Sequence, residues 1–128
     1  MSIRVLSYNC RGMRLGMSAG DKACRIVIDR LLEECDILCL QETFLPVQGL
    51  EKLNSFDPKF LGVGESTTDL STAVVRGRIP GGVAVLWDKK LDAVMKPIRL
   101  DVDWCIGLQY TYKNNSIVIP NVYTPYES

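Results

Sequence analysis

Two polar side chains that follow predicted strands are the first candidates for chemistry in this sequence. Glu42 comes just after four consecutive apolar residues, Ile37 to Leu40, which predict a short strand buried on both faces. Asn9 ends an earlier apolar stretch, residues 3–9. An open α/β sheet places its working groups just past the carboxyl ends of its strands. Both residues are therefore candidates for a functional site. The alternatives are a cap or ion-pair role for the carboxylate and a turn role for the asparagine.

A polar, irregular stretch from residue 65 to residue 80 carries further candidates. A loop of this length inside a compact domain tends to be functional or mobile. Arg76 and Arg78 within it suit contacts to a phosphate group, and they suit equally well the role of solvated loop charges. Both interpretations stay open at this point.

A helix must connect the two polar strand ends. Asp21 is a candidate N-cap, and apolar residues then recur at helical spacing up to residue 35. These apolar positions are Cys24, Val27, Ile28, Leu31 and Cys35. Strand, helix and strand in this order form a βαβ-like unit. If its strands are parallel neighbours, Asn9 and Glu42 emerge at the same edge of the sheet.

The remainder of the chain predicts strands linked by hairpins. The expected strands are 60–64, 83–87, 91–100, 104–112 and 116–123, with a short helix at 47–54 and a hairpin turn at 113–115. Pro97 places the 91–100 strand at a sheet edge. The predicted fold class is therefore α/β, with a mixed, mainly antiparallel sheet and a helix packed on it.

Composition excludes several classes of protein. The chain has 128 residues, 47% of them hydrophobic, so it can bury a core and disorder is not expected. Fifteen basic residues balance fifteen acidic ones, which argues against a passive electrostatic nucleic-acid binder but not against an enzyme that grips phosphates locally through a metal and a few arginines. Five cysteines without any histidine argue for reduced core thiols rather than zinc ligands. We expect an intracellular protein, cytoplasmic or nuclear, with no membrane association.

Four motifs occur in an order that resembles a known superfamily. They are Tyr8 to Gly12, Leu40 to Thr43, Gly81 to Leu86 and Asn121 to Pro125. Together they are similar to the endonuclease/exonuclease/phosphatase superfamily, and most of all to the endonuclease domains of LINE-class retrotransposons. The resemblance implies a four-layer α/β sandwich, with two sheets face to face and helices outside. It also implies cleavage of phosphodiester or phosphomonoester bonds with a divalent metal, usually magnesium.

The resemblance also implies roles for individual residues. Glu42 matches the metal-binding glutamate, and Asn9 matches the asparagine beside it at the metal site. Tyr123 matches a tyrosine that contacts the scissile phosphate, although an ordinary strand-end aromatic is the alternative. The candidates for substrate binding are Arg11, Arg76, Arg78 and Asn121.

The sequence departs from the family pattern after Tyr123. The later motifs, an Asp-x-Asn and a Ser-Asp-His, do not follow, and the sequence has no histidine to fill the general-base role. Residues 1–128 are therefore predicted to be the N-terminal half of the domain. We expect magnesium binding to be weak or absent and the chain to be inactive alone, which leaves its status as an enzyme open.

Half a sandwich would leave apolar surface uncovered. The residues expected to lose part of their cover are Val83, Val85, Ile117, Ile119 and the run Ile37–Leu40. An uncovered apolar face usually marks an interface, so we expect a homodimer, a complementary half-domain or another protein on this face. Two functions remain: a magnesium-dependent endonuclease module that contacts the DNA phosphate backbone, or a catalytically dead descendant that acts as a protein-binding module.

Overall fold

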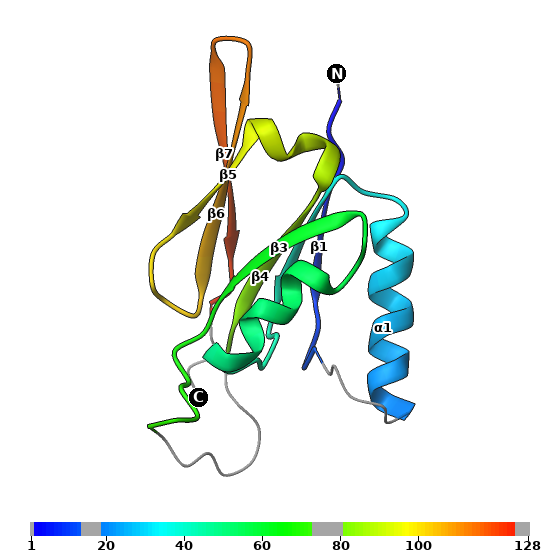
Figure 1. Ribbon diagram of the computed structural model, residues 1–128, viewed down its shortest axis with the longest axis vertical. Helices are drawn as coiled ribbons and strands as arrows, with labels where there is room; N and C mark the ends of the chain where they lie inside the picture. Colours follow the sequence, from blue (N-terminus) through cyan, green and yellow to red (C-terminus); the bar gives the residue numbers. More distant parts are fainter. Residues whose placement is uncertain (1, 14–18, 73–80, 125–128) are drawn as a thin grey trace.

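The computed structural model describes residues 2–13, 19–72 and 81–124, which form two β-sheets and a few helices (Figure 1). In chain order the elements are β1 (Val5–Asn9), α1 (Ala19–Leu32), β2 (Ile37–Gln41), η1 (Val47–Ser55), β3 (Phe60–Glu65), β4 (Val83–Asp88), η2 (Lys89–Val94), β5 (Met95–Arg99), β6 (Cys105–Tyr112) and β7 (Asn115–Val122). η1 and η2 are 3₁₀ helices. None of the helices in the described ranges is long and apolar enough to cross a membrane.

The seven strands of the described ranges divide into two sheets. The first sheet has the order β1-β2-β4-β3. In it β1 and β2 pair in parallel, with Asn9 opposite Gln41, and the other pairs are antiparallel. The second sheet, β5-β6-β7, is antiparallel throughout. The predicted mixed, mainly antiparallel pairing is confirmed, but it is shared between two sheets, whereas the sequence suggested one.

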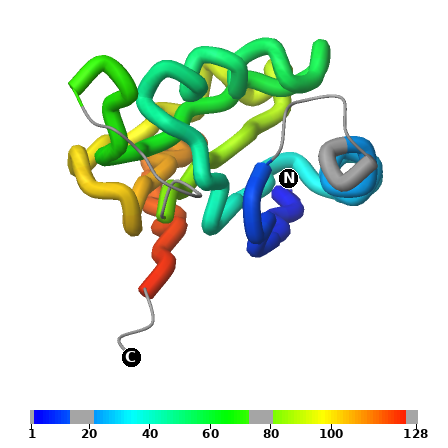
Figure 2. Tube along the Cα trace, turned by 90° about the horizontal axis from the view of Figure 1, so that it is seen from below, coloured from blue at the N-terminus to red at the C-terminus, as the bar shows by residue number. Residues whose placement is uncertain are grey.

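Helices α1 and η1 cover one face of the first sheet (Figures 1 and 2). Ile28 and Leu32 of α1 and Leu53 of η1 are buried in one core cluster with Leu38 of β2. The buried stripe of α1 runs through Ile28 and Leu32 at i, i+4 spacing. Val27, which was expected to face inward, lies beside this stripe and is 38% exposed. The helix begins at Ala19, before the predicted N-cap at Asp21.

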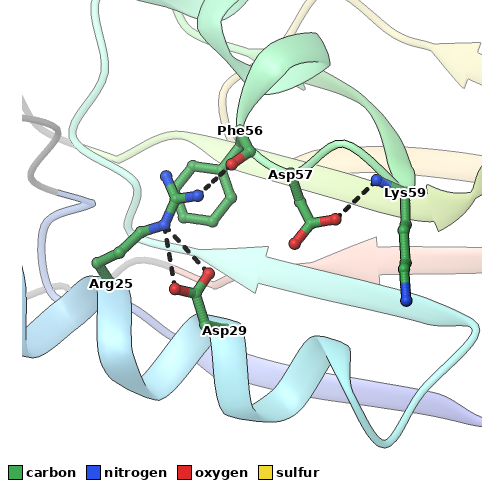
Figure 3. Close-up of polar contacts among 5 residues, drawn as sticks. All are labelled: Arg25, Asp29, Phe56, Asp57 and Lys59. Atoms are coloured by element: carbon green, nitrogen blue, oxygen red, sulfur yellow. Dashed lines mark hydrogen bonds and ion pairs between the residues drawn. The ribbon is translucent and has the colours of Figure 1, made fainter.

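A charged clamp holds α1 against the turn that follows η1 (Figure 3). The Arg25 guanidinium lies 3.8 Å from the centre of the Phe56 ring and also donates to the Phe56 carbonyl oxygen. Its Nε atom lies 3.1 Å from Asp29 Oδ1, one turn along the helix. Further along the same turn, Asp57 accepts a 2.8 Å bond from the backbone N–H of Lys59. The Arg25 contacts hold α1 against this turn, and the Asp57–Lys59 bond shapes the turn itself.

The second sheet packs on the other face of the first. Val83 and Val85 are 0% and 1% exposed, because they share a core cluster with Ile106 and Leu108 of β6. The residues of the Ile37–Leu40 run are also buried. The prediction that these residues would lose part of their cover is therefore wrong. The physical reason is that the chain folds its last three strands back as a facing sheet.

β7 is an edge strand of the second sheet. In the described part of the chain it pairs with β6 alone. Ile119 packs into the core between the sheets, whereas Ile117, Val118 and Val122 are 56%, 55% and 48% exposed. Pro120, which has no N–H to donate, suits this edge position. The exposure expected at Ile117 is therefore present, but it belongs to a sheet edge.

The predicted 91–100 strand divides into η2 and β5. The carboxylate of Asp88 accepts a 3.0 Å bond from the backbone N–H of Lys90 and so caps η2. Such local side-chain bonds compete with the sheet for backbone groups. The strand begins only at Met95 and pairs with β6 alone in the described chain, so the edge position predicted for Pro97 is confirmed.

Candidate active site

Asn9 and Glu42 lie side by side at one rim of the first sheet. The parallel register sets Asn9 opposite Gln41, which places Glu42 one residue beyond the paired strands. Asn9 Nδ2 donates a hydrogen bond of 3.1 Å to Glu42 Oε1. The adjacency expected from the βαβ-like unit is therefore confirmed, and a carboxylate with an orienting amide stands at the carboxyl ends of two parallel strands.

The backbone around the pair is held in an unusual conformation. Glu42 and Arg11 have φ angles of +50° and +49°, a left-handed region that is uncommon for residues with a side chain. The backbone N–H of Gly12 donates to the Glu42 carbonyl oxygen at 2.8 Å, and that of Arg11 donates to Asn9 Oδ1 at 3.0 Å. Backbone strain of this kind persists only where the surroundings over-determine it, and it clusters at functional sites.

Gly81 and Gly82 support the segment that carries Glu42. Their carbonyl oxygens accept bonds of 3.0 Å and 3.2 Å from the N–H groups of Phe44 and Thr43. Both glycines have positive φ, +66° and +95°, and a Cβ at Gly82 would lie 2.3 Å from Thr43 Oγ1. The Gly-Gly motif therefore allows the close approach of two backbones behind the rim.

An amide relay joins the two sheets just behind this rim. Gln41 Nε2 donates to Ser7 Oγ at 2.9 Å and to Asn121 Oδ1 at 2.8 Å. Asn121 Nδ2 donates to the carbonyl oxygens of Leu40 and Ala84 at 3.0 Å and 2.8 Å. Asn121, predicted to bind substrate, is only 2% exposed and bridges strands here. Its contact with a substrate stays a prediction.

Sequence reasoning missed Gln41 and Ser7 as members of this group. Gln41 lies inside the motif that ends in Glu42, and its position next to a candidate carboxylate was the available signal. Ser7 lies two residues before Asn9 on β1, so both side chains lie on the same face of the strand. This period-2 relation was the corresponding signal for Ser7.

The remaining predicted site residues are Tyr123, Arg11, Arg76 and Arg78. The backbone N–H of Tyr123 donates to the Trp104 carbonyl oxygen at 2.8 Å, and its half-buried side chain packs against the core between the sheets. Arg11 is exposed next to the Asn9–Glu42 pair in the chain. Arg76 and Arg78 lie outside the described residues. The roles proposed for all four stay predictions.

Cys10, directly after Asn9, is not suited to act as a nucleophile. Its side chain is buried, and burial together with the nearby Cys24 and Glu42 raises the pKa of the thiol to about 12. The thiolate is the reactive form of cysteine, and it is scarce at neutral pH when the pKa is this high. Chemistry at this rim therefore depends on the polar side chains.

Glu42 and Asn9 suit part of the magnesium site that the sequence resemblance implies. Mg²⁺ takes oxygen ligands, typically one or two carboxylates, and keeps several waters. Glu42 supplies a carboxylate, and the amide oxygen of Asn9 retains one lone pair beside its bond to Arg11. Within the described ranges no group of three or more His, Cys, Asp or Glu side chains could hold a metal. The two residues therefore fit as a partial ligand set.

A family model and solved structures match this chain. The model of the endonuclease/exonuclease/phosphatase family matches residues 6–125. The crystal structure of AP endonuclease LMAP from Leishmania major is similar, with a TM-score of 0.65 and 15% sequence identity, over 94% of this chain and 40% of that one. The human Nocturnin catalytic domain with bound sulfate anion has a TM-score of 0.53 and 20% identity, over 92% of this chain and 48% of that one. No curated protein sequence matches. This chain thus spans less than half of either solved structure, and at these identities the likeness shows the fold alone.

Proposed function

The chain belongs to the endonuclease/exonuclease/phosphatase family, and from this premise we propose that it is the N-terminal part of a metal-dependent phosphodiesterase, a DNA endonuclease of the LINE-class retrotransposon type. The observation that carries the proposal is the 3.1 Å bond between Asn9 and Glu42 at the carboxyl ends of two parallel strands. The retrotransposon type is supported by the four motifs in their order along the sequence.

Each rim residue has a distinct role in this proposal. Magnesium, when bound, would stabilise negative charge on the phosphate and the leaving oxygen. Glu42 would hold the ion through its carboxylate, and Asn9 would orient that carboxylate. Tyr123 would donate its phenolic proton in a hydrogen bond to a phosphate oxygen. The exposed Arg11 would contact the DNA backbone as a charged donor.

We propose that the 128 residues by themselves cleave DNA weakly or not at all. Attack by water requires a group that accepts its proton, and histidine, the commonest such group, does not occur in the sequence. Glu65 lies at the carboxyl end of β3, level with the end of β2. Its carboxylate pairs with Arg99 and the residue is 3% exposed, so it does not suit the role of general base. In this proposal the described residues would bind the metal and orient its ligand, and the general base would come from outside them.

Metal binding is the direct test. Mn²⁺, titrated in place of Mg²⁺ and followed by electron paramagnetic resonance, should bind the wild-type chain weakly and should not bind Glu42→Gln. Glu51→Gln, at an exposed position of η1, is the matched control and should bind as wild type does. Equal binding by all three proteins, or none by the wild type, would show that Glu42 is not a metal ligand.

A plasmid-nicking assay tests whether the chain cleaves DNA by itself and whether Glu42 is needed for that cleavage. We expect little or no nicking of supercoiled plasmid by the wild-type chain with Mg²⁺. Nicking that disappears in Glu42→Gln would contradict the proposed inactivity while supporting the nuclease site. Nicking that persists in Glu42→Gln would point to a contaminating nuclease.

The second candidate function is a catalytically silent interaction module. The exposed apolar side chains of Ile117, Val118 and Val122 on edge strand β7 favour it. For this case we propose that a second copy of the chain covers the β7 edge, since edge strands with exposed backbone groups readily pair. Sedimentation equilibrium would decide: a monomer at high micromolar concentration contradicts self-association, and loss of a dimer in Val118→Lys supports it.

We also propose an intracellular location, cytoplasmic or nuclear. Among the described residues, no disulfide joins the cysteines, which are Cys10, Cys24, Cys35, Cys39 and Cys105. Free thiols persist in reducing compartments. Localisation of a tagged chain by microscopy is the corresponding test.

A further inference from the structure

A relay of two side-chain amides, Gln41 and Asn121, joins the two sheets directly behind the proposed metal site. We propose that Gln41 and Asn121 are positioning residues, which hold the strand end that carries Glu42 in register with the strand end that carries Tyr123. The inference rests on the proposed function for its catalytic meaning. The structural role of the relay, which is to set the geometry of the rim, is inferred from its hydrogen bonds alone.

The bonds of Asn121 determine how its amide points. Only the nitrogen can donate to the carbonyl oxygens of Leu40 and Ala84, so the amide oxygen must face Gln41. Both amide hydrogens and the oxygen are then engaged. Leu40 and Ala84 face each other across β2 and β4, so one side chain from the second sheet is bonded to two strands of the first.

Burial argues that this contact selects one register. Asn121 is 2% exposed, and an amide left unbonded at such a depth would be costly. Its neighbours in the core between the sheets, Ile106 and Leu108, show that apolar side chains fill this space. A buried polar group whose bonds form in one arrangement penalises every other arrangement of β7 on the first sheet.

The relay reaches both candidate catalytic residues through short stretches of chain. Gln41 precedes Glu42, and its Nε2 also bonds Ser7 Oγ, two residues before Asn9 on β1. Tyr123 directly follows the last residue of β7, two positions after Asn121, and its side chain packs on the core between the sheets, where Asn121 is buried. A shift of Asn121 would therefore move Tyr123 and Glu42 relative to each other.

The test compares relay variants with a variant that only weakens the core. Gln41→Met and Asn121→Leu remove the relay bonds. Ile119→Val is the matched control, because it removes one methylene from the same face of β7 and leaves the relay intact. The readouts are the ¹⁵N–¹H signals of the Asn9 side-chain amide and the ring signals of Tyr123, neither of which needs a metal.

We expect both relay variants to move the Asn9 and Tyr123 signals together, and Ile119→Val to leave them in place at comparable loss of stability. Shifts no larger than in the control would overturn the proposal. If Asn121→Leu does not fold, Gln41→Met still decides, because Gln41 is half-buried.

A metal titration separates failure of this inference from failure of the proposed function. Residues that orient a ligand typically change metal affinity about 10- to 100-fold when mutated, so we expect a Mn²⁺ affinity loss of that size in both relay variants and none in Ile119→Val. If wild type binds no Mn²⁺, the proposed function fails and the magnetic resonance comparison still tests the relay. If wild type binds Mn²⁺ and the relay variants bind equally well, the positioning role fails alone.

Discussion

Asn9 Nδ2 lies 3.1 Å from Glu42 Oε1, although the two residues are 33 positions apart in the sequence. The amide oxygen of Asn9 in turn accepts a bond from the backbone N–H of Arg11. Asn9 therefore connects the loop after β1 with the carboxylate after β2. Its first task in this structure is to orient Glu42, and a direct contact to metal would use the remaining lone pair of its oxygen.

Asn9→Ala should weaken metal binding more than it weakens the fold. The two lost hydrogen bonds, to Glu42 and from the Arg11 N–H, are both exposed, so the free energy of unfolding should fall by only about 1 kcal/mol. The affinity for Mn²⁺ should fall about 10-fold or more, because the carboxylate loses its orienting partner. Urea denaturation and Mn²⁺ titration measure the two effects, with the exposed Asn115→Ala as control. A stability loss without any change in affinity would contradict the orienting role.

Gly82→Ala should be strongly destabilising, and the cost should depend on Thr43. Gly82 has a φ of +95°, and its Cβ would lie 2.3 Å from Thr43 Oγ1. We expect a loss of about 2 kcal/mol or more in the free energy of unfolding. Thr43→Ala in the same chain should relieve the steric part, so that the double variant loses less than the sum of the two single losses. Strict additivity in urea denaturation would argue against this contact.

Thr43→Val should leave stability unchanged or raise it. The Thr43 hydroxyl is buried and has no hydrogen-bond partner among the described residues, so its desolvation is not offset by a bond there. Replacement by a methyl group of similar shape should change the free energy of unfolding by between zero and about +1 kcal/mol. Thr111→Val, which breaks an exposed 2.9 Å contact to Ser116, provides the comparison. Marked destabilisation of Thr43→Val would reveal a hidden partner for the hydroxyl.

Arg99→Met should destabilise the chain by leaving a buried charge alone. Arg99 of β5 pairs with Glu65 at the end of β3, and Glu65 is 3% exposed. We expect a loss of about 2 kcal/mol, less than for a fully buried pair because the Arg99 side chain is half-exposed. The double variant with Glu65→Gln should recover part of this loss. Lys96→Met, exposed on the same strand, should have little effect in thermal denaturation.

Stability should fall as the pH rises from about 9 toward 11. Burial raises the pKa of Cys10 to about 12 and those of Cys35 and Cys39 to about 11, from an ordinary value of 9.0. In this window the unfolded chain releases thiol protons that the native chain retains. Each buried thiol should therefore lower the free energy of unfolding by about 1.4 kcal/mol per pH unit.

Urea denaturation at several pH values measures this slope. Cys39→Ala should make the fall in the free energy of unfolding with pH less steep, by the contribution of one thiol. A free energy of unfolding that stays constant between pH 8 and pH 10.5 would show that these thiols ionise equally well in the native state.

Much of the fold was predictable because local patterns record burial. The buried run Ile37–Leu40 predicted β2, and apolar residues at helical spacing predicted α1. Their succession predicted parallel neighbours and so the adjacency of Asn9 and Glu42, which the structure confirms. The split of the 91–100 region was missed because one side-chain bond, from Lys90 N–H to Asp88, was enough to favour a 3₁₀ turn over extended chain.

The sequence by itself determined most of the buried positions, the ends of β1 and β2 and the polar groups that stand at those ends, because the spacing of apolar residues along the chain reflects them. Only the tertiary structure decided what covers each buried face. It folded β5, β6 and β7 back onto the first sheet and brought Asn121 within 2.8 Å of Gln41, 80 residues away in the chain. Periodicity states that a face is hidden, whereas the identity of the covering element depends on long-range packing that no local pattern encodes.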